Sequence, residues 1–479
     1  MRGRRVVLLG LGRFGGQLAA ARWFCEAGAR VLVTDLKPAS ALADSLARLE
    51  GLPIEFRLGG HDERDLLGAD LVCVSPAVPR QAPLRRLLAE RAIPWTTEMN
   101  LAAAALPAPP LGVTGSNGKT TTASLLASAL AAGLQRRVHL GGNMGQPLLG
   151  RLHEIGSQDL VVLELSSFQL EDLRDGPGIR PQLALITNVL PNHLDRHGTL
   201  EAYVACKRTL VEGLGPEGLA VLNREDPIVR SFEAVARRRG ARVVTFGLRR
   251  PPRGAGAAAF LAQGRLVYRD ETGAERCYGE AAALRLCGRH NLANVLAVVA
   301  ACGALGARAE RVAAALAAFR PLPHRLELVA EHGGVLYVND SKATTPEAAA
   351  AAVQAYAGRA VLLAGGAGKG TSLLPLARAA VAARARAVIA YGQCRAEIAA
   401  AVATAAAAAP RRPGARPPVE VCEGLEEAFV RAQAHARPGS VVLLSPGCAS
   451  YDQYLCYEER GAHFRRLVGE WLARRPAGR

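Results

Sequence analysis

Lysine is scarce in this chain. Arginine supplies most of the 59 basic residues, and only five lysines occur. They are Lys37, Lys119, Lys207, Lys342 and Lys369. Because arginine serves at ordinary surface positions here, a retained lysine indicates a position that needs a compact ammonium group or an amine able to lose its proton. All of them except Lys37 lie in the motifs described below.

Long hydrophobic runs and paired cysteines are also lacking. The apolar stretches 123–132 and 401–409 fall short of the roughly 20 residues that a membrane span requires. The N-terminal "MRGRRVVLLGLG" has a basic start, but its apolar run is too short for a signal peptide and ends in turn glycines. The ten cysteines form no CxxC pair and show no metal-type spacing, which argues against a cysteine-based zinc site. We therefore expect reduced thiols and a cytoplasmic location, without membrane partners.

Aromatic residues make up only 5% of the chain, although its formal net charge is +17. Without aromatic side chains beside the arginines, no stacking platform for nucleic acid is visible. Arginines spread along the chain instead favour small anionic substrates over a nucleic-acid partner. The length of 479 residues predicts two or three domains.

The N-terminal region predicts a Rossmann-like domain over residues 1–107. A strand at 6–9, a helix at 17–27 and a strand at 30–34 enclose a GxGxxG loop formed by Gly10, Gly12 and Gly15. A further strand at 70–75 runs into "SPAVP", at the sheet edge where open α/β folds bind ligands. The Pro-rich segment at 106–110 indicates the end of this domain.

Two more α/β domains are predicted, so the fold class is α/β with three domains. Strands at 111–114, 160–165 and 183–187 predict a central P-loop-type ATPase domain with a parallel sheet over 108–321. Strands at 335–338, 361–364, 387–391 and 441–444, alternating with helices, predict a C-terminal Rossmann-like domain over 322–479. The biased segments 249–258 and 401–418 are interpreted as surface insertions.

The stretch "GVTGSNGKTTTASLL", 112–126, predicts a phosphate-binding loop between a strand and a helix. Backbone N–H groups and the helix N-terminus face an anion, while Lys119 neutralises phosphate and Thr120 reaches Mg²⁺. Its glycines fall at Gly112, Gly115 and Gly118, which differs from the commonest P-loop spacing. The loop therefore predicts a nucleoside triphosphate site of a less common class.

Several motifs together carry a family resemblance that extends from Gly10 to about Tyr457. They are "TGSNGKTTT", "ELSSFQLE", "TNVLPNHLDRHGTLEAYVACK", "GRHNLANVLA", "PHRLE", "NDSKATTPEA" and "LLSPGCASYDQY". The chain resembles the Mur ligase family. The resemblance implies an ATP-dependent, ADP-forming amide ligase of peptidoglycan precursor synthesis. Such an enzyme activates UDP-N-acetylmuramoyl-L-alanine as an acyl phosphate and joins it to D-glutamate, and we expect it to be a monomer.

The resemblance also implies roles for individual residues. The catalytic group comprises Lys119, Glu164, His193 and Lys207. Two Mg²⁺ ions are expected on Thr120, Glu164, His193 and a carbamate formed on Lys207. The implied ATP contacts are Gly115, Asn117, Gly118, Lys119, Thr120, Thr121, Asn291, Asn294, Arg325 and Asp340. The implied UDP-sugar contacts are Gly12, Arg13, Phe14, Asp35, Lys37, Ser75, Asn143, Ser166 and Gln169, and the implied D-glutamate contacts are Thr344, Lys369, Ser450 and Tyr457.

Without the family resemblance, several of these residues also fit ordinary structural roles. A lone histidine such as His193 is more often a loop residue than a ligand, and Asn291 fits a helix N-cap with Asn294 as a packed polar neighbour. Phe14 stands where relatives often place Ser or Thr, so a hydroxyl contact to the UDP diphosphate is expected to be missing.

Three other functions remain as alternatives. GxGxxG followed by Asp35 also fits an NAD-dependent dehydrogenase, although that reading leaves the Gly-Lys-Thr loop unexplained. A folylpolyglutamate synthase-like ligase uses a related phosphate loop but does not need the N-terminal domain. A nucleotide switch without catalysis fits the metal and substrate motifs least.

Overall fold

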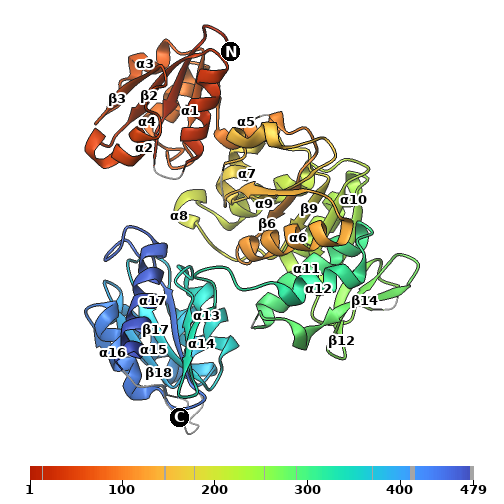
Figure 1. The fold of residues 1–479 in the computed structure, drawn as a ribbon, viewed down its shortest axis with the longest axis vertical. Helices are drawn as coiled ribbons and strands as arrows, with labels where there is room; N and C mark the ends of the chain where they lie inside the picture. The colour runs from red at the N-terminus through yellow and green to blue at the C-terminus, as the bar shows by residue number, and fades with distance from the viewer. Residues whose placement is uncertain are drawn as a thin grey trace. The chain divides into compact units, whose positions relative to one another are not determined.

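The computed structural model describes residues 1–12, 15–144, 147–176, 178–252, 254–286, 288–368, 370–409 and 416–474, with the backbone alone at 194 and 195. The chain forms three α/β domains, each built on its own sheet (Figure 1). The first two domains belong to one compact unit, Met1–Ala283 with Ala293–Ala317. The second unit comprises Leu284–Leu292 and Ala318–Arg479.

The first domain is a five-stranded parallel sheet in the order β3-β2-β1-β4-β5. Its strands are β1 (Arg5–Leu9), β2 (Arg30–Asp35), β3 (Ile54–Leu58), β4 (Leu71–Val74) and β5 (Trp95–Thr96). Its helices are α1 (Gly16–Glu26), α2 (Ala43–Ala47), α3 (Glu63–Leu67), α4 (Pro83–Glu90) and α5 (Glu98–Ala105), with a 3₁₀ turn at Ala39–Leu42. The strand order reverses between β1 and β4, and this crevice is where such sheets bind ligands.

The central domain contains a nine-stranded sheet in the order β14-β13-β12-β11-β10-β9-β6-β8-β7. Strands β6 to β12 pair in parallel, and β13 and β14 add an antiparallel edge. The strands are β6 (Leu111–Thr114), β7 (Val138–Gly142), β8 (Leu160–Glu164), β9 (Leu183–Ile186), β10 (Leu219–Asn223), β11 (Arg242–Gly247), β12 (Ala258–Ala262), β13 (Arg265–Arg269) and β14 (Glu275–Glu280).

The helices of this domain are α6 (Lys119–Leu134), α7 (Ser167–Arg174), α8 (Leu194–His197), α9 (Leu200–Glu212), α10 (Pro227–Arg238), α11 (Arg289–Ala304) and α12 (Ala309–Ala318), with 3₁₀ turns at Leu149–Glu154 and Ala281–Ala283. Helices α6 to α10 connect the parallel strands of this domain, and α11 and α12 follow its last strand. Because β6, β8 and β9 run parallel, their carboxyl ends bring the phosphate loop, Glu164 and the segment before His193 to one edge.

The third domain is a six-stranded sheet in the order β15-β16-β20-β17-β18-β19, antiparallel only at β15. Its strands are β15 (Glu327–His332), β16 (Val335–Asn339), β17 (Ala360–Gly365), β18 (Ala387–Tyr391), β19 (Val419–Cys422) and β20 (Val441–Gly447). Its helices are α13 (Pro346–Ala355), α14 (Leu374–Ala382), α15 (Arg395–Ala408), α16 (Leu425–His435) and α17 (Tyr457–Ala473).

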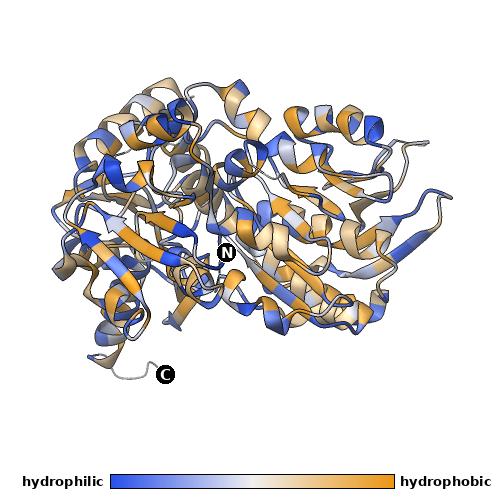
Figure 2. Cartoon of the chain, turned by 90° about the horizontal axis from the view of Figure 1, so that it is seen from above, coloured by the Kyte–Doolittle hydropathy of each residue, from blue (hydrophilic) through white to orange (hydrophobic). Residues whose placement is uncertain are grey.

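The hydrophobic strands explain this architecture. Sequences such as "LVVLE" of β8 and "AVLLAG" of β17 are buried at every position, as expected for parallel strands covered on both faces. Hydrophobic residues accordingly line the strands in Figure 2. Among the residues that the structure describes, none of the helices has the length and apolarity needed to cross a membrane.

Two local predictions were wrong. The segment 401–418 is not simply a surface insertion, because α15 continues to Ala408 and buries Val402 and Ala405 against the domain core. Alanine favours helix strongly, so a low-complexity run rich in alanine can extend a packed helix. Asn291 does not fit an N-cap, because it lies inside α11, which begins at Arg289.

Candidate active site

The phosphate loop joins β6 to α6, and its glycines have different roles. A Cβ on Gly115 would approach Thr187 Oγ1 to 1.9 Å, and one on Gly118 would approach Asn294 Oδ1 to 2.4 Å. Both glycines also have positive φ, which side chains other than hydrogen disfavour. Gly112 lies within β6, where an added Cβ would meet the Leu210 side chain at 2.6 Å. The unusual first glycine therefore serves packing, while the later two shape the loop.

Lys119 begins α6 and folds over the loop. Its Nζ donates hydrogen bonds to the carbonyl oxygens of Gly115 and Ser116, both at 3.0 Å. The loop backbone is fixed from the other side, where Asn188 Oδ1 accepts from Asn117 N at 2.9 Å. Thr120 and Thr121 follow Lys119 in the first turn of α6. The ammonium group and the helix N-terminus thus lie together at the loop, an arrangement that suits an anion.

Glu164 ends β8 with only 2% of its surface exposed. One carboxylate oxygen, Oε1, accepts a hydrogen bond from Asn143 Nδ2 at 3.1 Å. The other, Oε2, is buried without a hydrogen-bond partner. A buried carboxylate oxygen without a partner is costly, and a metal ion is a ligand that would remove that cost.

Lys207 lies on α9 with a fully buried amine. Its Nζ donates to the carbonyl oxygen of Gly115 at 2.8 Å and sits 4.6 Å from the ring centroid of Tyr203. Burial, followed by the nearby charge of Lys119, holds the Lys207 pKa well below its usual value. Arginine would stay charged in the same place, whereas the lowered pKa makes the Lys207 amine easier to deprotonate.

His193 lies in the segment between β9 and α8. Its φ of 54° places it in the left-handed region, and its backbone N donates to Asn192 Oδ1 at 2.9 Å. The imidazole packs edge-on against Phe168, with ring centroids 4.9 Å apart. Phe168 belongs to α7, which begins just after Glu164, so packing ties the histidine to the end of β8.

Asn294 packs against the phosphate loop, as the approach to Gly118 shows. Asn291 and Asn294 lie on the same helix, three residues apart, and are both buried. The structure thus brings Asn294 to the predicted ATP site. Asn291 is buried in the first turn of α11 and falls in the second unit.

The first domain holds its glycine loop with Asp35. Asp35 Oδ2 accepts from the backbone N of Leu11 at 2.8 Å and of Gly12 at 3.2 Å, while Oδ1 accepts from Lys37 N at 2.9 Å. Both carboxylate oxygens of Asp35 therefore accept backbone hydrogen bonds, and Oδ2 holds the glycine loop. Ser75 is buried at the adjacent end of β4, where its N donates to Leu9 O at 2.9 Å. Arg13 and Phe14, two of the predicted UDP-sugar contacts, lie outside the described residues.

Ser166 and Gln169 form a capping box at the start of α7. Ser166 Oγ accepts from Gln169 N at 3.2 Å, and Gln169 Oε1 accepts from Ser166 N at 3.0 Å. Their side chains therefore stabilise the helix that follows Glu164. Asn143, also predicted to contact the UDP-sugar, binds Glu164 with both its backbone N and its side-chain amide.

In the third domain, Asp340 is a buried carboxyl group at the end of β16. Its Oδ1 accepts from Leu326 N at 3.1 Å and its Oδ2 from Ser445 Oγ at 2.8 Å. Burial raises the Asp340 pKa to about 7, against the lowering effect of those hydrogen bonds and of Arg325. Arg325 is half-buried two residues before β15 begins.

A cavity of 420 Å³ opens beside the loop that follows β17. Thr344, Gly368, Gly370 and Cys448 are among its lining residues. Lys369, the predicted partner of the amino acid's side-chain carboxylate, lies outside the described residues, although both its neighbours line the cavity. Ser450 is buried just beyond Cys448, whereas Tyr457 at the start of α17 packs against Lys342, whose Nζ is 3.7 Å from its ring centroid.

Arg460 is a buried residue that the sequence reasoning missed. Its side chain is fully buried and donates to Ser341 Oγ at 3.0 Å, Ser341 O at 2.9 Å and Ala449 O at 3.1 Å. It also reaches Cys448 O at 3.2 Å. This guanidinium therefore joins the segment after β16 to the cavity wall. In a chain so rich in arginine, nothing in the sequence pattern distinguishes Arg460 from the others.

These features define the class of the protein, which is a ligase with three α/β domains and a phosphate-binding loop. Three family models match consecutive parts of the chain: "Mur ligase MurD-like, N-terminal domain" at 4–95, "Mur ligase middle domain" at 113–302 and "Mur ligase, glutamate ligase domain" at 324–448. The match over the N-terminal region assigns the GxGxxG loop to a ligase domain, so the dehydrogenase alternative is not supported.

Relatives match along nearly the whole chain. UDP-N-acetylmuramoylalanine--D-glutamate ligase from Roseiflexus sp. (strain RS-1) is 40% identical over 477 residues, covering 97% of this chain and 98% of the relative. The enzyme of the same name from Anaeromyxobacter dehalogenans (strain 2CP-C) is 41% identical over 486 residues, covering 98% of each chain. The fold is similar to UDP-N-acetylmuramate-alanine ligase from Thermotoga maritima, with a TM-score of 0.61, 19% identity and coverage of 98% of this chain and 100% of that one.

The chain belongs to the Mur ligase family. It is an ATP-dependent, ADP-forming amide ligase of peptidoglycan precursor synthesis. The enzyme class and the α/β fold predicted from the sequence are thereby confirmed.

Proposed function

We propose that this chain joins D-glutamate to UDP-N-acetylmuramoyl-L-alanine in the cytoplasm, acting as a monomer on small-molecule substrates. The observation that carries the proposal is that Lys207, a buried lysine, donates from Nζ to Gly115 O of the phosphate loop at 2.8 Å, while Glu164 is buried at the end of the neighbouring strand β8. The D-glutamate ligases 35–41% identical to this chain support the choice of acceptor.

The reaction makes an amide from a carboxylate in two balanced steps. The alanyl carboxylate oxygen attacks the γ-phosphorus of ATP, forming an acyl phosphate as the bond to ADP breaks. The amine of D-glutamate then attacks the acyl carbon, phosphate leaves with its carboxylate-derived oxygen, and the amine loses a proton. Because several anions meet, most of the catalysis comes from positioning and electrostatic stabilisation.

The chain's own residues supply that stabilisation. Gly115, Gly118 and the start of α6 orient the triphosphate of ATP, and the Lys119 ammonium group neutralises it. Asn294 supports the loop from the Gly118 side. The proposed adenine contacts are Asn291 and Asn294, and Arg325 and Asp340 of the third domain are proposed to contact the phosphates and ribose.

We assign magnesium binding to Thr120, Glu164, His193 and Lys207 as its carbamate. The partnerless Glu164 Oε2 fits a cation, and the lowered pKa of Lys207 favours the neutral amine that carbamate formation requires. Magnesium ions, when bound, neutralise charge that develops on the transferring phosphoryl group. Once the Lys207 ammonium group has lost its proton, the neutral amine attacks CO₂, a C–N bond forms and a second proton is released, which leaves a carboxylate as the ligand.

The cavity of the third domain is proposed to hold D-glutamate. Thr344 lines it, Ser450 lies beyond its wall, and Lys369 and Tyr457 are the remaining proposed contacts. For the UDP-sugar we retain Gly12, Arg13, Phe14, Asp35, Lys37, Ser75, Asn143, Ser166 and Gln169. Asp35, Ser166, Gln169 and Asn143 also have structural hydrogen bonds, so their substitution affects both loop geometry and substrate binding.

The proposal is tested by phosphate release from ATP with UDP-N-acetylmuramoyl-L-alanine and a set of acceptors. D-glutamate, L-glutamate, L-lysine and meso-diaminopimelate are compared at equal concentration, with mass spectrometry of the product. Release that depends on D-glutamate is expected. Release with another amino acid alone would refute the acceptor assignment and retain the ligase chemistry.

A further inference from the structure

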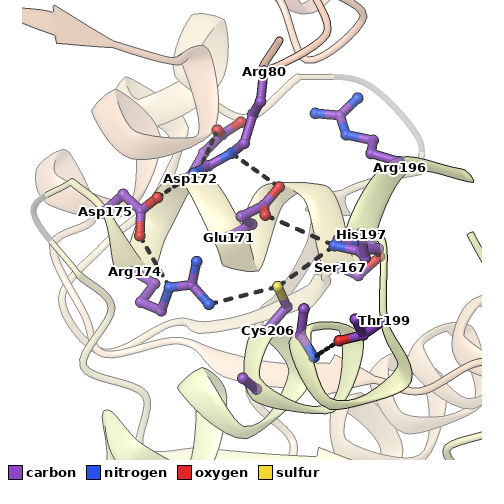
Figure 3. A network of polar contacts seen from close by, with 12 residues as sticks. Arg80, Ser167, Glu171, Asp172, Arg174, Asp175, Arg196, His197, Thr199 and Cys206 are labelled. Atoms are coloured by element: carbon purple, nitrogen blue, oxygen red, sulfur yellow. Dashed lines mark hydrogen bonds and ion pairs between the residues drawn. The ribbon is translucent and has the colours of Figure 1, made fainter. Parts of the chain in front are cut away.

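A second cluster of potential ligands lies outside the residues assigned to catalysis. Glu171 of α7, His197 of α8 and Cys206 of α9 point toward one another in Figure 3. Their donor atoms all lie within 4.8 Å of one another. The side chain of His197 is fully buried, that of Glu171 is 11% exposed, and Cys206 is buried as well. The three residues come from three separate helices.

The distance from His197 to Cys206 fits a hydrogen bond to sulfur, and the distances from His197 to both other residues also suit ligands around a common ion. His197 Nδ1 lies 3.7 Å from Glu171 Oε1 and 3.8 Å from Cys206 Sγ. A nitrogen–oxygen separation of 3.7 Å is too long for a hydrogen bond. Tetrahedral zinc, with bonds of about 2.0 Å to nitrogen and about 2.3 Å to sulfur, separates those two ligand atoms by about 3.5 Å. Small side-chain adjustments would bring the three atoms to that spacing.

Each candidate ligand is also oriented by a partner on its outer side. His197 Nε2 is 3.0 Å from Ser167 Oγ, which leaves Nδ1 directed at the cluster. Arg80 Nε pairs with Glu171 Oε2 at 3.1 Å, which leaves Oε1 on the inner side. Arg174 Nη1 donates to Cys206 Sγ at 3.7 Å. Metal ligands are characteristically held in this way by outer partners.

Carboxylates on and just after α7 offset part of the positive charge around the cluster. Arg80 also pairs with Asp172 at 3.5 Å, and Arg174 Nε donates to Asp175 at 2.9 Å. Arg196 of α8, 4.0 Å from the Phe168 ring centroid, adds a further positive charge. Arg85 pairs with Asp172 at 3.1 Å. Binding of a divalent ion to the Cys206 thiolate releases the thiol proton. The net charge of the cluster therefore rises by one unit and not by two.

We propose that Glu171, His197 and Cys206 form a zinc site, with the fourth coordination position taken by water. The ion would join α7, α8 and α9, and so fix the helix on which Lys207 immediately follows Cys206. None of the three is among the residues assigned to magnesium, and oxygen-preferring Mg²⁺ does not favour a thiolate ligand. The site is therefore structural and separate from the proposed catalytic ions.

The test is a Co²⁺ titration of the full chain in excess Mg²⁺, which occupies the oxygen-rich sites. One Co²⁺ per chain is expected, with a thiolate-to-cobalt charge-transfer absorption that Zn²⁺ abolishes. Cys206→Ser should remove that absorption, and His197→Gln should weaken binding about 10–100-fold. Cys302→Ser, which changes another fully buried cysteine of the same domain, should leave the absorption intact.

A second readout does not depend on the variants folding. In the wild-type chain, Zn²⁺ should protect Cys206 from alkylation, as measured by mass spectrometry of the peptide, while Mg²⁺ should not. Absence of the charge-transfer absorption in the wild type, or its persistence in Cys206→Ser, would refute the site. Neither result bears on whether the chain ligates D-glutamate, which the acceptor comparison decides.

Discussion

The phosphate-loop site and the cavity of the third domain are constructed in different ways. At the phosphate loop, two charged groups share one acceptor: Lys119 and the buried Lys207 both donate to Gly115 O, and the buried Glu164 on the neighbouring strand has an oxygen without a hydrogen-bond partner. Around the cavity, mostly glycines and small side chains form the described part of the wall, together with Leu373 and Glu397, and the fully buried Arg460 is hydrogen-bonded to the backbone of Cys448 in that wall. The comparison indicates that the first region controls charge and the second controls shape.

The largest expected effect is at Lys207. Lys207→Arg should lower kcat by at least about 1,000-fold, because a permanent guanidinium cannot form a carbamate and places a buried positive charge beside Lys119. The neighbouring Arg208→Lys, at a partly exposed ion pair with Glu212, serves as the control and should retain activity. Steady-state kinetics with and without added bicarbonate measure both. Full activity of Lys207→Arg would contradict the proposal that the phosphate-loop region depends on the charge at position 207.

Glu164→Gln should lower kcat by about 100-fold and raise the Mg²⁺ concentration needed for half-maximal rate. The amide keeps the size of the side chain and can still contact Asn143, but it removes the negative charge from the buried end of β8. Glu154→Gln, at a partly exposed pair with Arg151, is the matched control. An unchanged magnesium dependence in Glu164→Gln would argue against metal binding there.

In the third domain, Arg460→Met should raise the KM for D-glutamate by about tenfold and lower the free energy of unfolding by about 3 kcal/mol. Methionine fills part of the volume but removes the Arg460 donor from the carbonyl groups of Ser341 and Cys448, whereas Ala449 O still accepts from Ala367 N. Arg465→Met, at the partly exposed pair with Glu327, should affect stability less. A fall in kcat at unchanged KM would contradict a role confined to shape.

The last prediction concerns the pH dependence of stability at Asp340, whose pKa is raised by burial to about 7. The folded chain keeps this proton up to about pH 7, whereas the unfolded chain loses it near pH 4. Stability therefore falls as pH rises through this window, and the loss is complete above pH 7. Asp340→Asn should thus be stabilising by about 2–4 kcal/mol at pH 8 relative to pH 4.

Thermal unfolding of Asp340→Asn at both pH values measures this difference. The exposed Asp44→Asn variant is the control and should show no comparable dependence on pH. Equal stabilisation by Asp340→Asn at pH 4 and pH 8 would show that the carboxyl group is already ionised in the folded chain.

The phosphate loop was the part most readable from sequence, because its glycines, Lys119 and Thr120 are adjacent along the chain. The alternation of hydrophobic strands and helices likewise predicted the α/β class. The boundary of α15 was misjudged because composition alone does not show whether an alanine-rich run packs.

Contacts between distant segments were not readable. Arg460 joins Ser341 to Cys448 across more than a hundred residues of sequence, and no local pattern marks it. Cysteine spacing argued against a cysteine-based zinc site, yet that rule detects only ligands that are close in sequence. The cluster of Glu171, His197 and Cys206 is assembled by three helices, so only the fold reveals it.

The most direct test of the proposed acyl-phosphate chemistry follows one oxygen atom. UDP-N-acetylmuramoyl-L-alanine labelled with ¹⁸O in its alanyl carboxylate is incubated with ATP, Mg²⁺ and D-glutamate, and the released phosphate is analysed by mass spectrometry. Transfer through an acyl phosphate predicts one carboxylate oxygen in each phosphate formed, in step with the D-glutamyl product. Unlabelled phosphate released alongside that product would contradict the proposed chemistry.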